Sequence, residues 1–252
     1  GIYANQIYPA HFLFQNLAIQ NNLIHSSHEY GVKTLLFLGS ACIYPKYAEQ
    51  PIKESSILSG LLESTNEPYA IAKIAGIKLC ESYFKQYSDN FISVMPNNLY
   101  GPNDNFHPDT SHVIPALIQK FHNAKVTSNS YVKIWGSGNP LREFLHVDDL
   151  SEAMLFVLNN VSVEEIYNRG ISHINIGSGE EISIHELALM IKKIVGFKGK
   201  IKFDKSKPDG TPRKLLDNTI LNEKGWSPKI KLKNGIKELY NFYQQIEAEK
   251  YI

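Results

Sequence analysis

Apolar residues follow two alternating patterns along the first half of the chain, helical periodicity and short unbroken runs. Residues 11–30 carry apolar side chains at helical spacing, and Gly31 marks the end of that helix. The run 34–38 that follows is typical of a strand buried on both faces. A long helix over residues 69–87 and a second apolar strand over residues 91–95 come next. This helix–strand–helix–strand order predicts a parallel α/β sheet.

The second half is a mixture of helices and short strands without an inter-domain linker. Its clearest helix signal is Ser183 with Glu186, a capping box, with Gly196 just past the far end. Asp148 is the expected cap of an earlier helix. The periodicity predicts helices over residues 115–123, 148–158, 183–195 and 236–246, and strands over residues 132–135 and 173–177. Two lobes, if present, must therefore exchange strands.

Composition narrows the class of protein. The chain has 252 residues, 43% apolar and 20% charged, which excludes a disordered chain and suits one large or two small domains. A net charge of +1 gives no reason to expect a nucleic acid or an anionic membrane as partner. No apolar run is long enough to cross a bilayer. Two cysteines and no visible secretory leader favour the cytoplasm.

Three side chains suggest proton-transfer chemistry. Tyr69 and Lys73 stand four residues apart and share a helix face. An ammonium near a phenol lowers the pKa of the phenol, so Tyr69 could exchange a proton with a substrate oxygen. Ser40 ends the first predicted strand, where ligands bind in open α/β sheets, and its hydroxyl could hydrogen-bond a carbonyl. This combination is typical of the short-chain dehydrogenases/reductases.

Longer motifs make the resemblance closer. The chain resembles the GDP-L-fucose synthases, members of the extended branch of that superfamily, from its first residues to its last helix. The similar segments are GSACIYP at 39–45, NEPYAIAK at 66–73, MPNNLYGP at 95–102, NFHP at 105–108, SHVIP at 111–115, WGSG at 135–138, REFLHVDD at 142–149 and KPDGTPRK at 207–214.

The resemblance implies a fold and its division. We expect an α/β fold, a partial Rossmann-type parallel sheet whose first strands are absent, with a smaller α+β substrate-binding lobe. The remainder of the NADP-binding domain would comprise residues 1–105 and 143–178, and the substrate lobe residues 106–142 and 179–252. It also implies a homodimer in which the helix of Tyr69 and Lys73 packs across the two-fold axis.

The implied activity combines two steps in one site. Members of the family epimerise C3 and C5 of GDP-4-keto-6-deoxy-D-mannose and then reduce the C4 ketone with NADPH. By resemblance Ser40 and Tyr69 polarise the ketone, and Lys73 tunes Tyr69 and binds the nicotinamide ribose. Cys42 and His112 would be the acid and base of the epimerisation. Thiol and imidazole both exchange protons near neutrality after modest tuning.

The resemblance also assigns the binding residues. The expected cofactor-binding residues are Tyr69, Lys73, Asn98, Leu99 and His112. The expected substrate-binding residues are Lys120, Trp135, Arg142, Asp209 and Lys214, which would hold the diphosphate and the guanine. Lys120 stands where the family has arginine and lacks its bidentate fork. No cysteine or histidine spacing resembles a metal site, so no metal is expected.

One family feature is missing from the sequence. The Gly-rich GxxGxxG turn that holds the cofactor pyrophosphate at a helix N-terminus has no counterpart here. The first residue, Gly1, is not a methionine. We therefore expect the chain to be the C-terminal three quarters of a longer enzyme, and to bind NADPH poorly by itself.

Two alternative interpretations remain open. A nucleotide-sugar 4,6-dehydratase would carry an acidic pair where this chain has Cys42-Ile43, and a simple 4-epimerase needs no cysteine there. The other alternative is a non-catalytic nucleotide-sugar-binding or dimerisation protein that has lost the cofactor lobe. Retention of Ser40, Cys42 and Tyr69 together with Lys73 and His112 argues against it.

Overall fold

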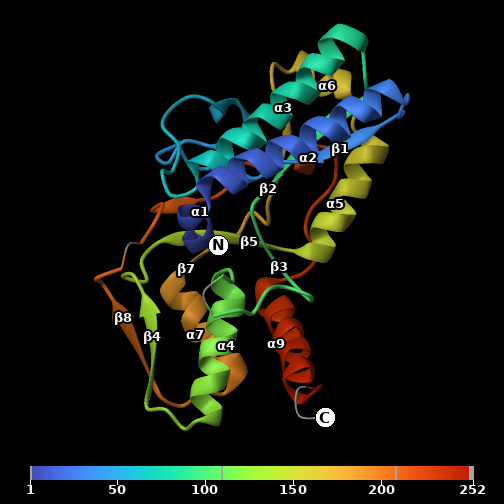
Figure 1. The fold of residues 1–252 in the computed structure, drawn as a ribbon. Coiled ribbons are helices and arrows are strands. Elements are labelled where there is room, and N and C mark those ends of the chain that lie inside the picture. Colours follow the sequence, from blue (N-terminus) through green and yellow to red (C-terminus); the bar gives the residue numbers. More distant parts are fainter. Residues whose placement is uncertain (1, 109, 208, 250–252) are drawn as a thin grey trace.

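The predicted parallel α/β architecture is confirmed. The computed structural model describes residues 2–108, 110–207 and 209–249. A first sheet has the strand order β1-β2-β6 with all pairs parallel, and the helices α2 and α3 run side by side along it (Figure 1). The elements of this part are α1 (Ile2–Ile7), α2 (Pro9–Glu29), β1 (Leu35–Leu38), α3 (Glu67–Tyr87), β2 (Phe91–Pro96) and β6 (Ile174–Ile176).

The first strand is less buried than its apolar run predicts, in agreement with the expected partial sheet whose first strands are absent. All six residues of β2 are buried, because β2 lies between β1 and β6. In β1, however, Leu35 to Phe37 are only partly buried and Leu38 is 39% exposed. Among the described residues β1 pairs with β2 alone, so it forms the edge of the sheet and has no neighbouring strand on its other side. A continuous apolar run predicts a strand but not its place in the sheet.

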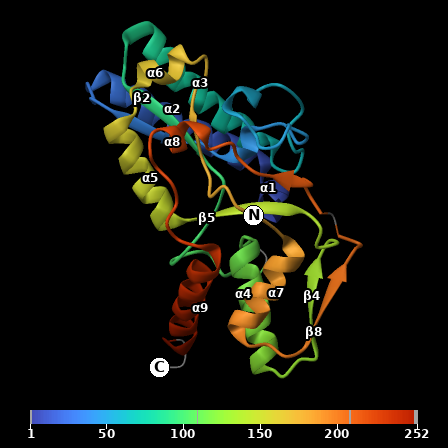
Figure 2. The same cartoon turned by 180° about the vertical axis from the view of Figure 1, so that it is seen from behind.

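A second group of strands surrounds β5. Its first residues pair with β7 and β9, and its last three pair with β3. Helices α4 and α7 lie beside a two-stranded parallel sheet of β4 and β8, with α9 nearby (Figure 2). The elements are β3 (Asn98–Tyr100), α4 (Val113–Val126), β4 (Tyr131–Trp135), β5 (Leu141–His146), β7 (Glu181–Ser183), α7 (Ile184–Val195), β8 (Lys200–Asp204), β9 (Arg213–Lys214) and α9 (Leu232–Glu249).

The remaining helices lie between the strands and helices of these two parts. They are η1 (Ala41–Ile43), η2 (Glu54–Ser56), α5 (Val147–Asn160), α6 (Val163–Asn168) and α8 (Thr219–Glu223). The cap of α5 differs from the prediction, because His146 precedes the helix and its side chain accepts a hydrogen bond from the Asp148 amide. The capping box of Ser183 and Glu186 is confirmed in α7, and Gly196 ends that helix in the left-handed region, at φ 78°.

The buried side chains gather in distinct clusters. The largest joins α4, β4, α7 and α9, and a second joins β2, β6 and α5. A third cluster surrounds η1 and includes Ile43 and Tyr44. Among the helices that the structure describes, none is long and apolar enough to cross a membrane.

Candidate active site

The carboxyl end of β1 brings three predicted catalytic residues together. Ser40 stands just after the strand in extended conformation, and the single turn η1 then turns Cys42 back toward it. The Ser40 side chain contacts both the Cys42 thiol and the Tyr69 hydroxyl as a hydrogen-bond partner. Tyr69 lies in the first turn of α3, which packs against η1. Ser40 therefore lies between the Cys42 thiol and the Tyr69 hydroxyl, two groups that can exchange protons.

The expected lowering of the Tyr69 pKa is wrong in this structure. Burial and the neighbouring Cys42 raise the pKa of Tyr69 to about 12, although the contact with Ser40 lowers it. Lys73 does not reverse this shift. Its ammonium nitrogen lies 5.8 Å from the centre of the Tyr69 ring and donates to the Leu38 carbonyl at 3.0 Å. Tyr69 is therefore a protonated donor at neutral pH.

Lys73 and Tyr69 fit the ribose of a nicotinamide nucleotide. The ammonium and the hydroxyl both stand at the end of β1, and burial lowers the pKa of Lys73. A phenol and an amine side by side can each hydrogen-bond a ribose hydroxyl. These two groups are therefore candidates for the nicotinamide end of such a site, whereas no Gly-rich phosphate loop is found among the described residues.

Cys42 is 7% exposed and mainly surrounded by protein atoms. Burial raises the pKa of its thiol, while Lys214, Ser40 and Lys73 act in the opposite direction. The thiol is neutral at rest, and Lys214 and Lys73 favour its deprotonated form. That balance suits a group which must both give and take a proton.

His112 stands apart from this group of three. It is the residue before α4 and is exposed, and partial enclosure lowers the pKa of its imidazole. The acidic side chain that faces it is Asp104, which raises that pKa. The imidazole is therefore mostly neutral near pH 7 and can act as a base. No contact joins His112 to Cys42 among the described residues.

The two remaining nicotinamide candidates are engaged inside the protein. Asn98, at the start of β3, donates its side-chain amide to the Glu143 carbonyl at 2.8 Å and to the Asn97 side chain at 3.1 Å. Leu99 packs against the core cluster of β2 and α5. The structure places both after β2, but their described contacts are internal.

The predicted substrate residues form a second group across β5. Trp135 is 62% exposed, and the Lys120 and Lys207 ammonium nitrogens lie 5.7 and 5.4 Å from its ring. Arg142 on β5 pairs with Lys214 on the parallel strand β9. Lys214 acts electrostatically on both Cys42 and Arg142. Lys214 therefore lies near both sets of predicted residues, the catalytic set that includes Cys42 and the substrate-binding set that includes Arg142.

The Asp209 carboxylate stabilises the turn that contains Gly136 and Ser137. Its carboxylate accepts hydrogen bonds from the Ser137 amide at 2.6 Å and the Ser137 hydroxyl at 2.7 Å. A side chain at Gly136 would meet this carboxylate at 2.3 Å, and Gly136 has φ 82°, so the turn needs glycine. The Asp209 carbonyl lies 3.5 Å from the Arg142 guanidinium. Asp209 thus orients the arginine and the loop beside Trp135.

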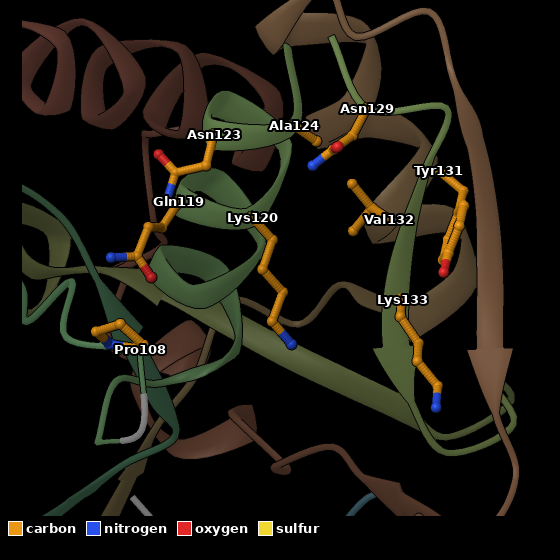
Figure 3. Close-up of a pocket in the computed structure, with 9 residues that line it drawn as sticks. All are labelled: Pro108, Gln119, Lys120, Asn123, Ala124, Asn129, Tyr131, Val132 and Lys133. Atoms are coloured by element: carbon orange, nitrogen blue, oxygen red, sulfur yellow. The ribbon is translucent and has the colours of Figure 1, made fainter. Parts of the chain in front are cut away.

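Lys120 also lines an open pocket of about 350 Å³ between α4 and β4 (Figure 3). Its side chain extends from α4 into the space that Tyr131 and Lys133 border from the strand (Figure 3). Burial lowers the pKa of Lys120, and Lys133 is held by Asp204 at 2.7 Å. Lys120 is therefore the cation of this pocket without a described acidic partner.

Two residues near the site, Glu143 and Tyr44, were not predicted from the sequence. Glu143 is fully buried, and its carboxylate accepts from the amides of Gly179 at 2.7 Å and Leu216 at 3.0 Å and from the Asn97 side chain. It lies next to Arg142 and ties down the segment just after Lys214. The only sequence signal was its place between Arg142 and an apolar run, where an acidic residue is unexpected.

The second candidate is Tyr44, whose buried hydroxyl meets His173 and Asn175 of a distant segment. Nothing local in the sequence indicates this contact.

One group of described residues has metal-ligating side chains within reach of each other, namely His146, Asp148 and Glu238. The His146 nitrogen that faces Asp148 accepts the helix-capping hydrogen bond from its amide at 3.3 Å. Asp148 and Glu238 are both exposed. His146 thus caps α5, and the three residues lie outside those predicted to act on substrate.

Known proteins are similar to this chain in sequence and in fold. Residues 1–177 match the model of the NAD dependent epimerase/dehydratase family. GDP-L-fucose synthase 1 of Arabidopsis thaliana is 57% identical over 96% of this chain and 73% of its own length. GDP-L-fucose synthase of Escherichia coli is 56% identical over 96% of this chain and 76% of its own length.

A solved structure agrees. The NADP-bound GDP-L-fucose synthetase of Naegleria fowleri superposes with a TM-score of 0.87 and 28% identity, covering 96% of this chain and 75% of that one. The chain therefore belongs to the NAD dependent epimerase/dehydratase family and, within it, to the branch formed by the GDP-L-fucose synthases.

Proposed function

We propose that the chain carries the site in which GDP-4-keto-6-deoxy-D-mannose is epimerised at C3 and C5 and reduced at C4 to GDP-L-fucose. The observation that carries this proposal is the position of Ser40 between Cys42 and Tyr69. A ketone oxygen placed at Ser40 and Tyr69 lies beside the thiol that would exchange protons on the adjacent carbons. One binding position of the sugar then serves both steps.

The epimerisation uses the acidity of protons next to a ketone. A base removes the proton from C3 or C5, and the electron pair moves onto the C4 oxygen as an enolate. Ser40 and Tyr69 stabilise that oxygen by hydrogen bonds. An acid then protonates the carbon on the other face. Cys42 and His112 are our candidates for this pair, and the pKa of each is shifted by its surroundings, upward for Cys42 and downward for His112.

The reduction needs a hydride at C4 and a proton at the C4 oxygen. NADPH supplies the hydride when bound, and we assign its nicotinamide end to Tyr69, Lys73, Asn98, Leu99 and His112. Tyr69, with a pKa of about 12, holds its proton until the oxygen becomes an alkoxide and then donates it. Lys73 orients that end of the site from the end of β1.

The nucleotide would lie across β5. Arg142 and Lys214 on paired strands offer two cations to a diphosphate, and the exposed ring of Trp135 offers a flat surface to the guanine. Lys120 and Asp209 border that surface and complete the assignment. Two core clusters, one that contains Phe144 of β5 and one that contains Leu145, support a division into a cofactor lobe and a substrate lobe. They do not follow the proposed boundaries, because Leu221 and Trp226 pack in the cluster of β2 and β6.

We further propose that the protein is a homodimer that works in the cytoplasm. Exposed apolar side chains on α2 support the dimer, and the two free cysteines agree with a reducing compartment.

The test is the substitution Tyr69→Phe in the full-length protein that carries this sequence. It removes the proton donor and keeps the ring, so NADPH oxidation with the keto sugar should fall by a factor of about 100 to 10,000. Tyr87→Phe, on the same helix and half exposed, is the matched control and should retain the wild-type rate. An unchanged rate for Tyr69→Phe would contradict the role of Tyr69 as proton donor, and a wild-type protein without NADPH oxidation would support the non-catalytic binding protein instead.

A further inference from the structure

A buried chain of hydrogen bonds stands directly behind Cys42. Tyr44 follows η1 and is 3% exposed. Its hydroxyl oxygen lies 2.6 Å from His173 Nε2 and 2.5 Å from Asn175 Oδ1, both on fully buried residues around β6. Ser172 Oγ lies 3.1 Å from His173 Nδ1. More than 120 residues of sequence separate Tyr44 from these partners.

The direction of each hydrogen bond is determined by Asn175. Its amide nitrogen donates to the carbonyls of Ile52 at 2.9 Å and Asp217 at 3.2 Å, so its oxygen must face Tyr44. The Tyr44 hydroxyl therefore donates to Asn175. The Tyr44 oxygen accepts from His173 Nε2–H, and His173 Nδ1 accepts from Ser172. Each of these hydrogen bonds then has one donor and one acceptor.

This hydrogen-bond network holds the two segments that carry Cys42 and Lys214. Tyr44 is two residues after Cys42, and Ile43 between them is fully buried. Asp217 follows the segment of Lys214, which is held to Ile52 by hydrogen bonds from the Ile52 amide to Leu215 and from the Asp217 amide to Ile52. Cys42 and Lys214 thus stand on two segments that the same buried network joins.

We propose that Tyr44 is a positioning residue for the epimerisation. Its hydroxyl, anchored on His173 and Asn175, holds η1 so that the Cys42 thiol stays beside Ser40 and the reacting carbon. The inference rests on the proposed function, because it assigns Tyr44 to the step that uses Cys42. Reduction uses Ser40, Tyr69 and Lys73 and does not require the thiol.

The test separates the two steps. Tyr44→Phe keeps the ring and removes the anchor. We expect deuterium incorporation from D₂O at the carbon that Cys42 serves to fall by a factor of about 10 to 100, since a displacement near 1 Å has that effect on rate. Reduction of the already epimerised ketone by NADPH should change by less than a factor of about 3. Tyr47→Phe, on the same loop and 79% exposed, is the matched control.

A second measurement needs no turnover. In a Cys80→Ala background Cys42 is the single thiol. Alkylation of Cys42 by iodoacetamide should be at least about 3-fold faster in Tyr44→Phe than in Tyr47→Phe, because the freed η1 turn opens toward solvent. His173→Gln, which retains an N–H donor, should lie between the two.

Each outcome decides one question. A full-length wild-type protein without exchange and without reduction contradicts the proposed function, and the alkylation rates still test the anchor. If Tyr44→Phe lowers exchange and reduction by the same factor, or lowers neither, Tyr44 has no specific role in epimerisation. Equal alkylation rates in Tyr44→Phe and Tyr47→Phe contradict the anchoring itself.

Discussion

The buried imidazole of His173 makes the stability of the protein depend on pH. Burial lowers its pKa from 6.5 to about 3 in the folded chain. The unfolded chain therefore binds more protons than the folded chain between those values, and the free energy of unfolding rises with pH across that window. The stabilisation is fully present above pH 6.5 and is lost as the pH falls toward 3.

We expect His173 to contribute a slope of at most about 1.4 kcal/mol per pH unit between pH 3.5 and 6. His173→Gln should flatten the unfolding free energy measured by urea titration at several pH values. His11→Gln, at an exposed position, should retain the wild-type slope. Parallel pH profiles for wild type and His173→Gln would contradict the burial of a neutral imidazole.

At the scale of the element, α7 is the helix whose start is best determined by local sequence. The Ser183 hydroxyl accepts from the Glu186 amide at 3.1 Å, and the Glu186 carboxylate accepts from the Ser183 amide at 3.2 Å. Ser183→Ala should therefore lower the free energy of unfolding by about 1 kcal/mol. Ser82→Ala, at an exposed position inside α3, should change it by less than about 0.5 kcal/mol. Equal thermal unfolding midpoints for these two variants would contradict a stabilising cap.

Local signals explain which elements were predictable. The capping box, the glycine after α7 and the periodicity of α3 each depend on residues within four positions, and those predictions are confirmed. The burial of β1 depends on which strands flank it, and the cap of α5 on a competition between His146 and Asp148. Neither is encoded by the residues of the element alone.

The same distinction applies to the candidate site. Ser40, Cys42 and Tyr69 were predictable because a strand end and the following helix bring them together. The partners of Glu143 and Tyr44 come from segments far away in sequence, so no spacing indicates them. The pKa of Tyr69 was predicted in the wrong direction because burial raises it, and the Lys73 ammonium donates to the Leu38 carbonyl. The roles of these residues stay predictions until the variants are measured.

At the scale of the whole molecule, α2 presents apolar side chains to solvent. Phe14, Ile19 and Leu23 are 71%, 62% and 61% exposed, an unusual density for one helix. α2 lies beside α3 on the outer side of the first sheet, and a second copy could cover this pair (Figure 1). Because the resemblance places the two-fold axis at α3, α2 extends the same surface.

The expected result is that Leu23→Glu shifts the molar mass measured by light scattering from dimer to monomer. A buried, unpaired carboxylate disfavours the interface. Leu155→Glu is the matched control, since Leu155 is 63% exposed on α5, away from α2. A wild-type chain that is monomeric at all concentrations, or a Leu23→Glu variant that stays dimeric, would contradict the proposed surface.

The six residues of β5 belong to both halves of the molecule, because its start pairs with β7 and β9 and its end with β3. Because β5 pairs with strands of both halves, no boundary between two independent domains can be drawn within it. Recombination that exchanges one half for that of a relative would break the backbone ladder on which Arg142 and Glu143 stand. New sugar specificities in such a scaffold should therefore arise by replacing side chains around an unchanged frame, and a chimaera joined within β5 should fail to fold.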